Sequence, residues 1–183
     1  MNLVDHIFWI DLPHYKGECS YKGETVCYQS NPQQIDAAAV VLNSLLKHGN
    51  SCISVLSILR THHKAMCGEF RLNHPSLLKK INFFYGGQTC NNANTLIVLP
   101  VMASGTTYEP VIEEIEYKTL HLFNVLKERK FDRVIVVGEK KRWLSIKSYF
   151  SSTLSEIPAT DYVVRESFFE QDIQKAVEEL LSR

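Results

Sequence analysis

The chain has 183 residues, of which 45% are hydrophobic and 22% charged, an ordinary globular composition. Twenty lysines and arginines balance twenty aspartates and glutamates. This composition excludes a disordered, collagen-like or low-complexity chain, and the zero net charge excludes a domain that holds nucleic acid through overall positive charge. We expect a single domain over residues 1–183, large enough to bury a proper core.

The first predicted elements are a strand and an amphipathic helix. Ile7–Leu12 is an apolar run that predicts a buried strand. Asn31 and Pro32 have the residue types of a helix N-cap and a first helical residue. His48-Gly49-Asn50 is typical of a helix end. The apolar positions between these signals fall on one helical face, at Ile35, Ala38, Ala39, Leu42, Leu45 and Leu46.

The alternation of strands and helices continues to the end of the chain. Residues 13–30 and 103–110 are rich in turn residues and are expected to be loops. Phe168 and Phe169 are expected to pack into the core. The predicted strands are Ile53–Ile58, Ile81–Tyr85, Thr95–Met102, Arg133–Gly138 and Asp161–Val164, and the predicted helices are His62–Phe70, Val111–Lys130, Lys141–Leu154 and Phe168–Ser182.

Continuously apolar strands separated by helices favour an α/β fold with a mostly parallel sheet. We expect about five or six strands with helices on both faces, which is a three-layer arrangement. The chain has no GxxxxGK[ST] loop, no GxGxxG, no HExxH and no GxSxG. Domains of this fold class often bind nucleotides, but the usual loop that would hold the phosphates is absent from the sequence.

The cysteines and histidines give two groups of possible metal ligands. Neither group has a closed Cys2His2 arrangement or a second CxxC, so surface histidines and buried free thiols are the favoured interpretation and no metal is predicted. Five cysteines without a CxxC pair are typical of a reducing compartment. The two groups are His62, His63 and Cys67 in a predicted helix, and His14, Cys19 and Cys27 in a predicted loop.

No long apolar window and no signal peptide occur in the sequence, because acids interrupt the first apolar run, MNLVDHIFWIDLP. We therefore expect an intracellular protein, cytoplasmic or nuclear, without a membrane segment. A cluster of cations surrounds the RVIVVG strand and includes Arg129 and Arg133. It is either a set of solvated helix ends or a phosphate-facing rim. The weak candidates for nucleic-acid contact in it are Lys127, Lys130, Lys140, Lys141 and Arg142.

Three stretches, in order, resemble the second RecA-like domain of superfamily 1 helicases of the up-frameshift type. Asn31-Pro32-Gln33-Gln34 and the strand Ile53–Ile58 resemble that family's Asn-Pro-x-Glu helix and the strand of its motif IV. Arg60 falls on the arginine of that motif, whereas Ser57, Ile58, Leu59 and His62 depart from it. Residues 124–130, NVLKERK, followed by RVIVVG, resemble motif VI without a gap.

The resemblance implies roles for two arginines and a loss at one motif. Arg129 falls on the family's arginine finger, which stabilises charge on the transferred phosphoryl group of ATP. Arg60 and Arg129 are thus the candidate ATP contacts. Ile81–Val98 occupies the place of motif V, but its Gly-x-Glu is not reproduced, and Glu128 could pair with Arg129.

The resemblance implies that this chain is not an ATPase on its own, because the family holds ATP and Mg²⁺ between two RecA-like domains. One hypothesis is an eroded helicase-like domain that acts as a protein-interaction module in intracellular RNA or DNA processing, with RNA favoured. A second is the second motor domain of a working helicase, which supplies Arg129 to a first domain not present in this chain. RNA or DNA binding has weak support under either hypothesis, and no cofactor is required.

A third hypothesis is a flavodoxin-like domain that binds a small ligand beyond the carboxyl ends of its strands. Gly86-Gly87, Ser104-Gly105-Thr106 and Gly138 would line that site.

Overall fold

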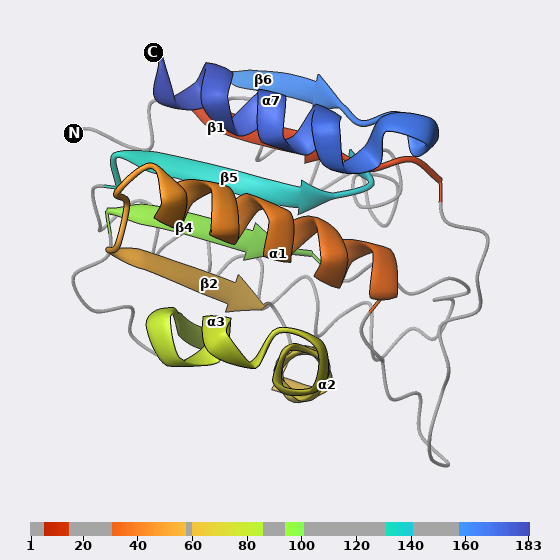
Figure 1. Cartoon of the computed structure of the whole chain (residues 1–183), viewed down its shortest axis with the longest axis vertical. Coiled ribbons are helices and arrows are strands. Elements are labelled where there is room, and N and C mark those ends of the chain that lie inside the picture. The colour runs from red at the N-terminus through yellow and green to blue at the C-terminus, as the bar shows by residue number, and fades with distance from the viewer. Residues whose placement is uncertain (1–5, 15–30, 58–59, 86–93, 101–130, 141–157) are drawn as a thin grey trace.

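Six strands form one sheet in which every neighbouring pair is parallel (Figure 1). The computed structural model describes residues 6–14, 31–57, 60–85, 94–100, 131–140 and 158–183. The sheet order is β3-β2-β4-β5-β1-β6. The strands are β1 (Ile7–Asp11), β2 (Ile53–Ser57), β3 (Asn82–Tyr85), β4 (Thr95–Leu99), β5 (Arg133–Gly138) and β6 (Ala159–Val163).

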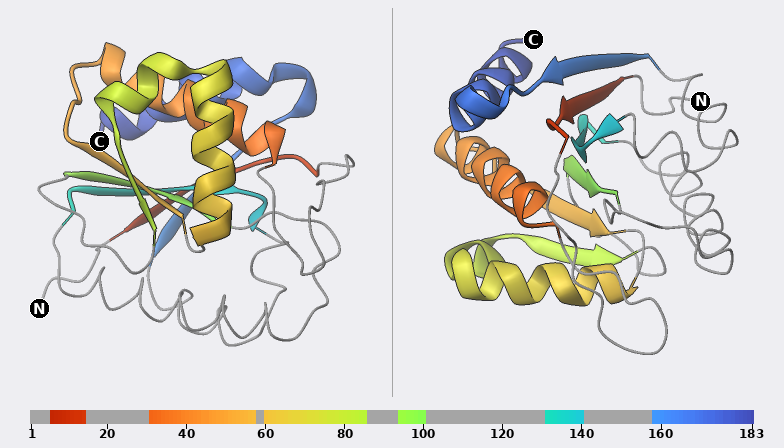
Figure 2. Two further views of the ribbon diagram at one scale, coloured as in Figure 1. Left: turned by 90° about the horizontal axis from the view of Figure 1, so that it is seen from below. Right: turned by 90° about the vertical axis from the view of Figure 1, so that its right-hand side faces the viewer.

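The described helices lie over one face of this sheet (Figures 1 and 2). The longest of the described helices crosses the middle of the face, next to the C-terminal helix on one side and two further helices on the other. A 3-10 turn, Glu166–Phe168, leads into the C-terminal helix. The helices are α1 (Pro32–Lys47), α2 (Arg60–Asn73), α3 (Pro75–Lys80) and α7 (Phe169–Leu181).

The core lies between this helical layer and the sheet. Apolar side chains of α1, among them Leu42 and Leu45, are fully buried against β-strand residues. The opposite face of the sheet is buried as well: Trp9 and Ile10 are neighbours in β1 that point to opposite faces, and they are 2% and 0% exposed. Burial of both faces accounts for the continuously apolar strands. The predicted fold class, a three-layer α/β domain around a parallel sheet, is confirmed.

The signals that predict α1 are confirmed in detail. Asn31 has an extended backbone, and its side-chain oxygen accepts hydrogen bonds from the backbone N–H groups of Gln33 and Gln34, at 2.9 and 3.2 Å. Pro32 is the first helical residue, where its missing N–H costs nothing. Gly49 follows the helix with φ +83°, a conformation that glycine adopts without steric cost.

Several element boundaries in the prediction are wrong by a few residues. The helix predicted at His62–Phe70 is α2 and spans Arg60–Asn73, and the last strand is Ala159–Val163. The helix α3 has no counterpart in the prediction, because a six-residue helix shows too little periodicity. The predicted loop 103–110 and the predicted helices Val111–Lys130 and Lys141–Leu154 lie outside the described residues.

The prediction that Phe168 packs into the core is wrong. This side chain is 46% exposed, and the guanidinium of Arg165 lies 4.3 Å from the centre of its ring. Phe169 is half-buried against the core. The 3-10 turn at Glu166–Phe168 explains the difference, since it rotates Phe168 away from the face that α7 presents to the sheet.

Candidate functional site at the carboxyl edge of the sheet

The carboxyl ends of all six strands meet at one edge because the sheet is entirely parallel. Ligands of open α/β sheets bind beyond this edge. The N-terminal ends of α1 and α2 lie at the same edge: α2 begins shortly after β2, and Gln34 near the start of α1 contacts the residue that follows β4. The side chains at this edge therefore form the candidate site.

Lys140, two residues after the end of β5, is held by contacts within the chain. Its Nζ lies 2.8 Å from each carboxylate oxygen of Asp161 on β6. The same ammonium lies 5.5 Å from the ring centre of Trp9, which neighbours Asp161 in the register of β1 and β6. The cation therefore interacts with a carboxylate and with the face of an aromatic ring.

Asp11 closes the edge between β1 and β5. Its Oδ1 accepts a hydrogen bond of 3.0 Å from the backbone N–H of Lys140, where the chain turns helical after β5. The Asp11 carboxylate therefore takes up the first backbone donor beyond Glu139 at the end of β5. Next to it, His14 Nδ1 lies 3.2 Å from Oε1 of Glu139. Two acids at the ends of β1 and β5 are thus engaged within the chain, Asp11 with a backbone N–H and Glu139 with the ring of His14.

Gln34 joins the neighbouring pair of strand ends. Its side-chain amide is completely buried, and its Nε2 donates to the carbonyl oxygens of Pro100, at 2.8 Å, and Val137, at 2.9 Å. One amide group therefore ties the start of α1 to the ends of both β4 and β5. The bridge takes up the Pro100 and Val137 carbonyl oxygens at this edge.

Three further buried side chains near this edge keep polar atoms without a hydrogen-bond partner. These are Asn31 at its Nδ2, Ser57 at its Oγ and His62 at both ring nitrogens, and each side chain is 1% exposed. Burial, and secondly the charge of His63, lowers the pKa of His62 to about 4. His62 is therefore a neutral imidazole near neutral pH. Such groups can hydrogen-bond to a buried water or a polar ligand.

The histidine and cysteine pair on α2 does not make a metal site by itself. Cys67 Sγ lies 3.7 and 3.9 Å from the ring nitrogens of His63, one helical turn apart. Burial lowers the pKa of His63 and raises that of Cys67. Within the described ranges, no three His, Cys, Asp or Glu side chains gather closely enough to hold a metal ion. His62 is buried, so the expectation of a surface histidine there is wrong.

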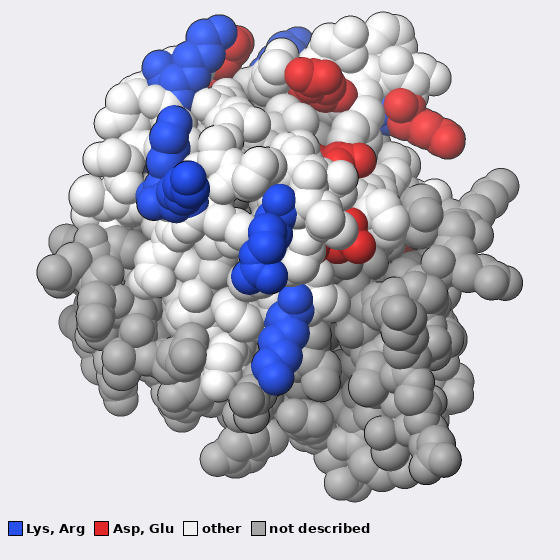
Figure 3. Space-filling model, turned by 60° about the horizontal axis from the view of Figure 1, so that its bottom comes forward, with Lys and Arg blue, Asp and Glu red and all other residues white. Residues whose placement is uncertain are grey.

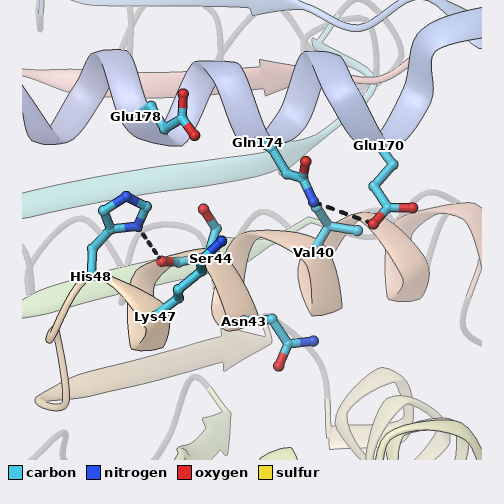
Figure 4. Close-up of a pocket in the computed structure, with 8 residues that line it drawn as sticks. All are labelled: Val40, Asn43, Ser44, Lys47, His48, Glu170, Gln174 and Glu178. Atoms are coloured by element: carbon cyan, nitrogen blue, oxygen red, sulfur yellow. Dashed lines mark hydrogen bonds between the residues drawn. The ribbon is translucent and has the colours of Figure 1, made fainter.

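A hollow of about 170 Å³ lies away from this edge, between α1 and α7 (Figure 4). Its polar groups bond within their own helices: His48 Nδ1 donates to the carbonyl oxygen of Ser44 at 2.8 Å, and Gln174 Nε2 donates to Glu170 at 3.3 Å. Because these groups do not converge on a common point, the carboxyl edge remains the better candidate site.

Of the candidate ATP and nucleic-acid contacts from the sequence, the structure describes two, Arg60 and Lys140. Arg60 begins α2 at the carboxyl edge, which places its backbone where ligands of such sheets bind. Lys140 is at the same edge but is paired with Asp161. Arg133, another member of the predicted cation cluster, lies at the opposite end of β5 and donates to Asn50 at 3.3 Å. The candidates outside the described residues are Lys127, Arg129, Lys130, Lys141 and Arg142, together with Cys19 and Cys27.

The sequence interpretation missed the residues that organise this edge. The sequence pattern indicates Asp11 only as part of a strand and Gln34 only as part of a helix. A carboxylate at the end of a buried strand is the signal that could have indicated Asp11. Nothing in the sequence indicates the bridge that Gln34 forms, because its two acceptors are backbone carbonyls of distant strands.

No protein-family model matches the chain, and no curated protein matches it at a significant level. The class of protein rests on the fold, which is an α/β domain with an all-parallel six-stranded sheet. This fold is consistent with a RecA-like domain. The resemblance to a helicase domain stays a prediction. None of the described helices is long and apolar enough to cross a membrane.

Proposed function

We propose that this chain is a helicase-like domain that acts as a protein-interaction module in intracellular nucleic-acid processing, specifically of RNA. The observation that supports this proposal is the use of the carboxyl edge for internal contacts. Asp11 caps the backbone of Lys140, and Asp161 holds its ammonium. Two groups that could meet a phosphate are therefore already bonded to carboxylates of the chain.

The local charge at this edge supports the same proposal. The ends of β1 and β5 and the middle of β6 contribute three carboxylates, those of Asp11, Glu139 and Asp161. The charge of Asp161 is matched by Lys140, and the remaining negative charge of Asp11 and Glu139 disfavours a nucleotide or a nucleic-acid backbone beside them. On this proposal the chain does not hydrolyse ATP on its own, and ATP with Mg²⁺ would be engaged only next to a separate first RecA-like domain.

The test is affinity capture from a cell lysate with the whole chain as bait, with and without nuclease. We expect a stoichiometric protein partner that survives nuclease and is retained equally by an Arg129→Ala bait. Recovery of nucleic acid alone, lost after nuclease treatment, would contradict the proposal.

One observation favours a second candidate, the second motor domain of a working helicase. Arg60 begins α2 at the edge where ligands of parallel sheets bind. Under this hypothesis, Arg60 and Arg129 contact ATP held by a first domain. In a longer protein that contains such a domain, Arg129→Ala would then reduce ATP hydrolysis by about a thousandfold, as loss of an arginine finger does. Under the interaction-module proposal the same change has little effect.

A further inference from the structure

Unpaired cations gather on one side of the molecule, along α2, α3 and the end of α1 (Figure 3). Elsewhere in the described part of the chain, three basic side chains meet acids: Lys140 pairs with Asp161, Arg165 with Asp172, and Arg183 with Glu179. Arg133 donates to Asn50, and Lys175 is a single exposed cation on α7. Figure 3 shows basic side chains in a row across this side, with acids to one side of it. The exposed cations without an ion pair here are Lys47, Lys64, Arg71, Lys79 and Lys80.

The row has a regular geometry on α2. Lys64 and Arg71 are seven residues apart, so they share one face of the helix and lie about 10 Å apart along its axis. Gly68 lies between them, and a Cβ atom placed there would meet no neighbouring atom within 4 Å. The surface between the two cations is therefore open. α3 packs against α2 and carries two adjacent exposed lysines in its last turn, Lys79 and Lys80.

The acids close to this row are already engaged. Glu69 accepts a hydrogen bond of 3.2 Å from Asn73, and Asp36 lies 3.6 Å from His74. The cations of the row are thus free for an external anionic partner. We define the α2–α3 face as Lys64, Arg71, Leu72, Lys79 and Lys80.

Leu72 decides between two kinds of anionic partner. It is 79% exposed, the most exposed large apolar side chain among the described residues, and it directly follows Arg71. A nucleic-acid backbone gains nothing from an apolar neighbour, and nucleic-acid interfaces are strongly basic, whereas this chain has no net charge. An acidic peptide with one apolar side chain complements both the row of cations and the exposed Leu72.

We propose that the α2–α3 face docks an acidic segment of a partner protein, with carboxylates on the row of cations and one apolar side chain over Leu72. The proposal rests on the interaction-module function and names the chemistry of the partner. Exposed ion pairs each contribute little to binding, so the apolar contact and the number of pairs set the affinity. Binding is therefore expected to weaken as salt is added.

The probe is a fluorescein-labelled peptide of alternating acidic and small polar residues with a single central leucine, titrated with the whole chain. We expect saturable binding that falls by about tenfold in a Lys64→Glu/Arg71→Glu double variant. Leu72→Ser should also weaken binding, and replacing the leucine of the peptide by serine should remove that difference. Lys175→Glu, an exposed lysine on α7, is the matched control and should bind as the unchanged chain does.

Three outcomes would overturn the proposal: no binding of the peptide, equal binding by the double variant, or a single-stranded oligonucleotide that binds more tightly and is lost in the same variant. Circular dichroism of each variant verifies that the fold is kept. Repeating the lysate capture with the double variant separates this proposal from the broader one. If a protein partner is still captured, the module function stands and the α2–α3 face is wrong as its docking site. If the unchanged chain captures no partner, the module function itself fails.

Discussion

Lys140 and Asp161 are joined through both carboxylate oxygens, each 2.8 Å from the ammonium nitrogen. Trp9 contacts the same pair. It is the β1 residue opposite Asp161 on β6, and the Lys140 ammonium lies 5.5 Å from the centre of its ring. A residue that the sequence offers as a nucleic-acid contact is thus a structural link between the end of β5 and the edge strand β6.

The first prediction concerns Lys140. Because its ammonium is held by Asp161, Lys140→Ala should leave the affinity for single-stranded RNA within about twofold of the unchanged chain. Fluorescence anisotropy with a labelled oligonucleotide measures this. Asp161→Asn is the companion variant, because it frees the same ammonium without removing it. A loss of binding in Lys140→Ala together with a gain in Asp161→Asn would show that the lysine does contact phosphate.

The second prediction concerns the bridge formed by Gln34. Gln34→Ala removes two hydrogen bonds and leaves the buried carbonyl oxygens of Pro100 and Val137 without their donor. The free energy of unfolding should fall by about 2–4 kcal/mol, measured by urea denaturation. Gln33→Ala, in the preceding half-buried position, is the control and should cost less than about 0.5 kcal/mol. Equal losses in the two variants would show that the bridge adds nothing.

The third prediction is a pH dependence caused by His62. Burial lowers the pKa of this histidine from 6.5 to about 4 in the folded chain, so the unfolded chain binds the extra proton between these values. The contribution of His62 to stability is therefore complete above pH 6.5 and declines as the pH falls toward 4, by about 3 kcal/mol in all. Urea denaturation across this pH range measures the decline.

His62→Leu tests the origin of that decline. The variant has no group to protonate at this position and no unpartnered ring nitrogens, so its stability should change less between pH 6.5 and 4. His48→Gln, at the exposed end of α1, should keep the decline of the unchanged chain. Parallel curves for His62→Leu and the unchanged chain would assign the decline to other groups.

The fourth prediction concerns the N-cap of α1. Asn31→Ala removes the acceptor for the backbone N–H groups of Gln33 and Gln34 and should cost about 0.5–2 kcal/mol of stability. Asn31→Asp keeps an acceptor at the same place and should retain most of the stability. Thermal denaturation compares the two. An aspartate variant as unstable as the alanine variant would contradict a capping role.

The central elements of the fold could be predicted because their signals are local. An N-cap asparagine, a proline at the next position and a glycine after the last turn mark α1 at both ends. Buried strands such as β5 carry long apolar runs, because neither face of a three-layer sheet meets water. The six-residue helix α3 and the 3-10 turn before α7 escaped prediction, since elements of this length show no clear period.

The candidate site could be predicted much less well, because its contacts join distant parts of the chain. From the sequence alone, Lys140 is one of several lysines that could contact a phosphate. Only the pairing of β1 with β6 brings Asp161 beside it. The sequence likewise favours a surface position for His62 on a predicted helix. In the structure it shares the buried face of α2 with Met66 and Phe70.

The strand order also constrains how the protein can be made. β1 lies inside the sheet, and its neighbours are β5 and β6: Ile7 pairs with Val134 on one side and with Ala159 on the other. During synthesis, more than a hundred residues leave the ribosome before the first strand has any partner in the sheet. The apolar run of β1 must therefore stay unpaired during that time. This delay makes a nascent or interrupted chain a target for chaperones and for aggregation, and it leaves a chain that stops before β5 without a place for its first strand.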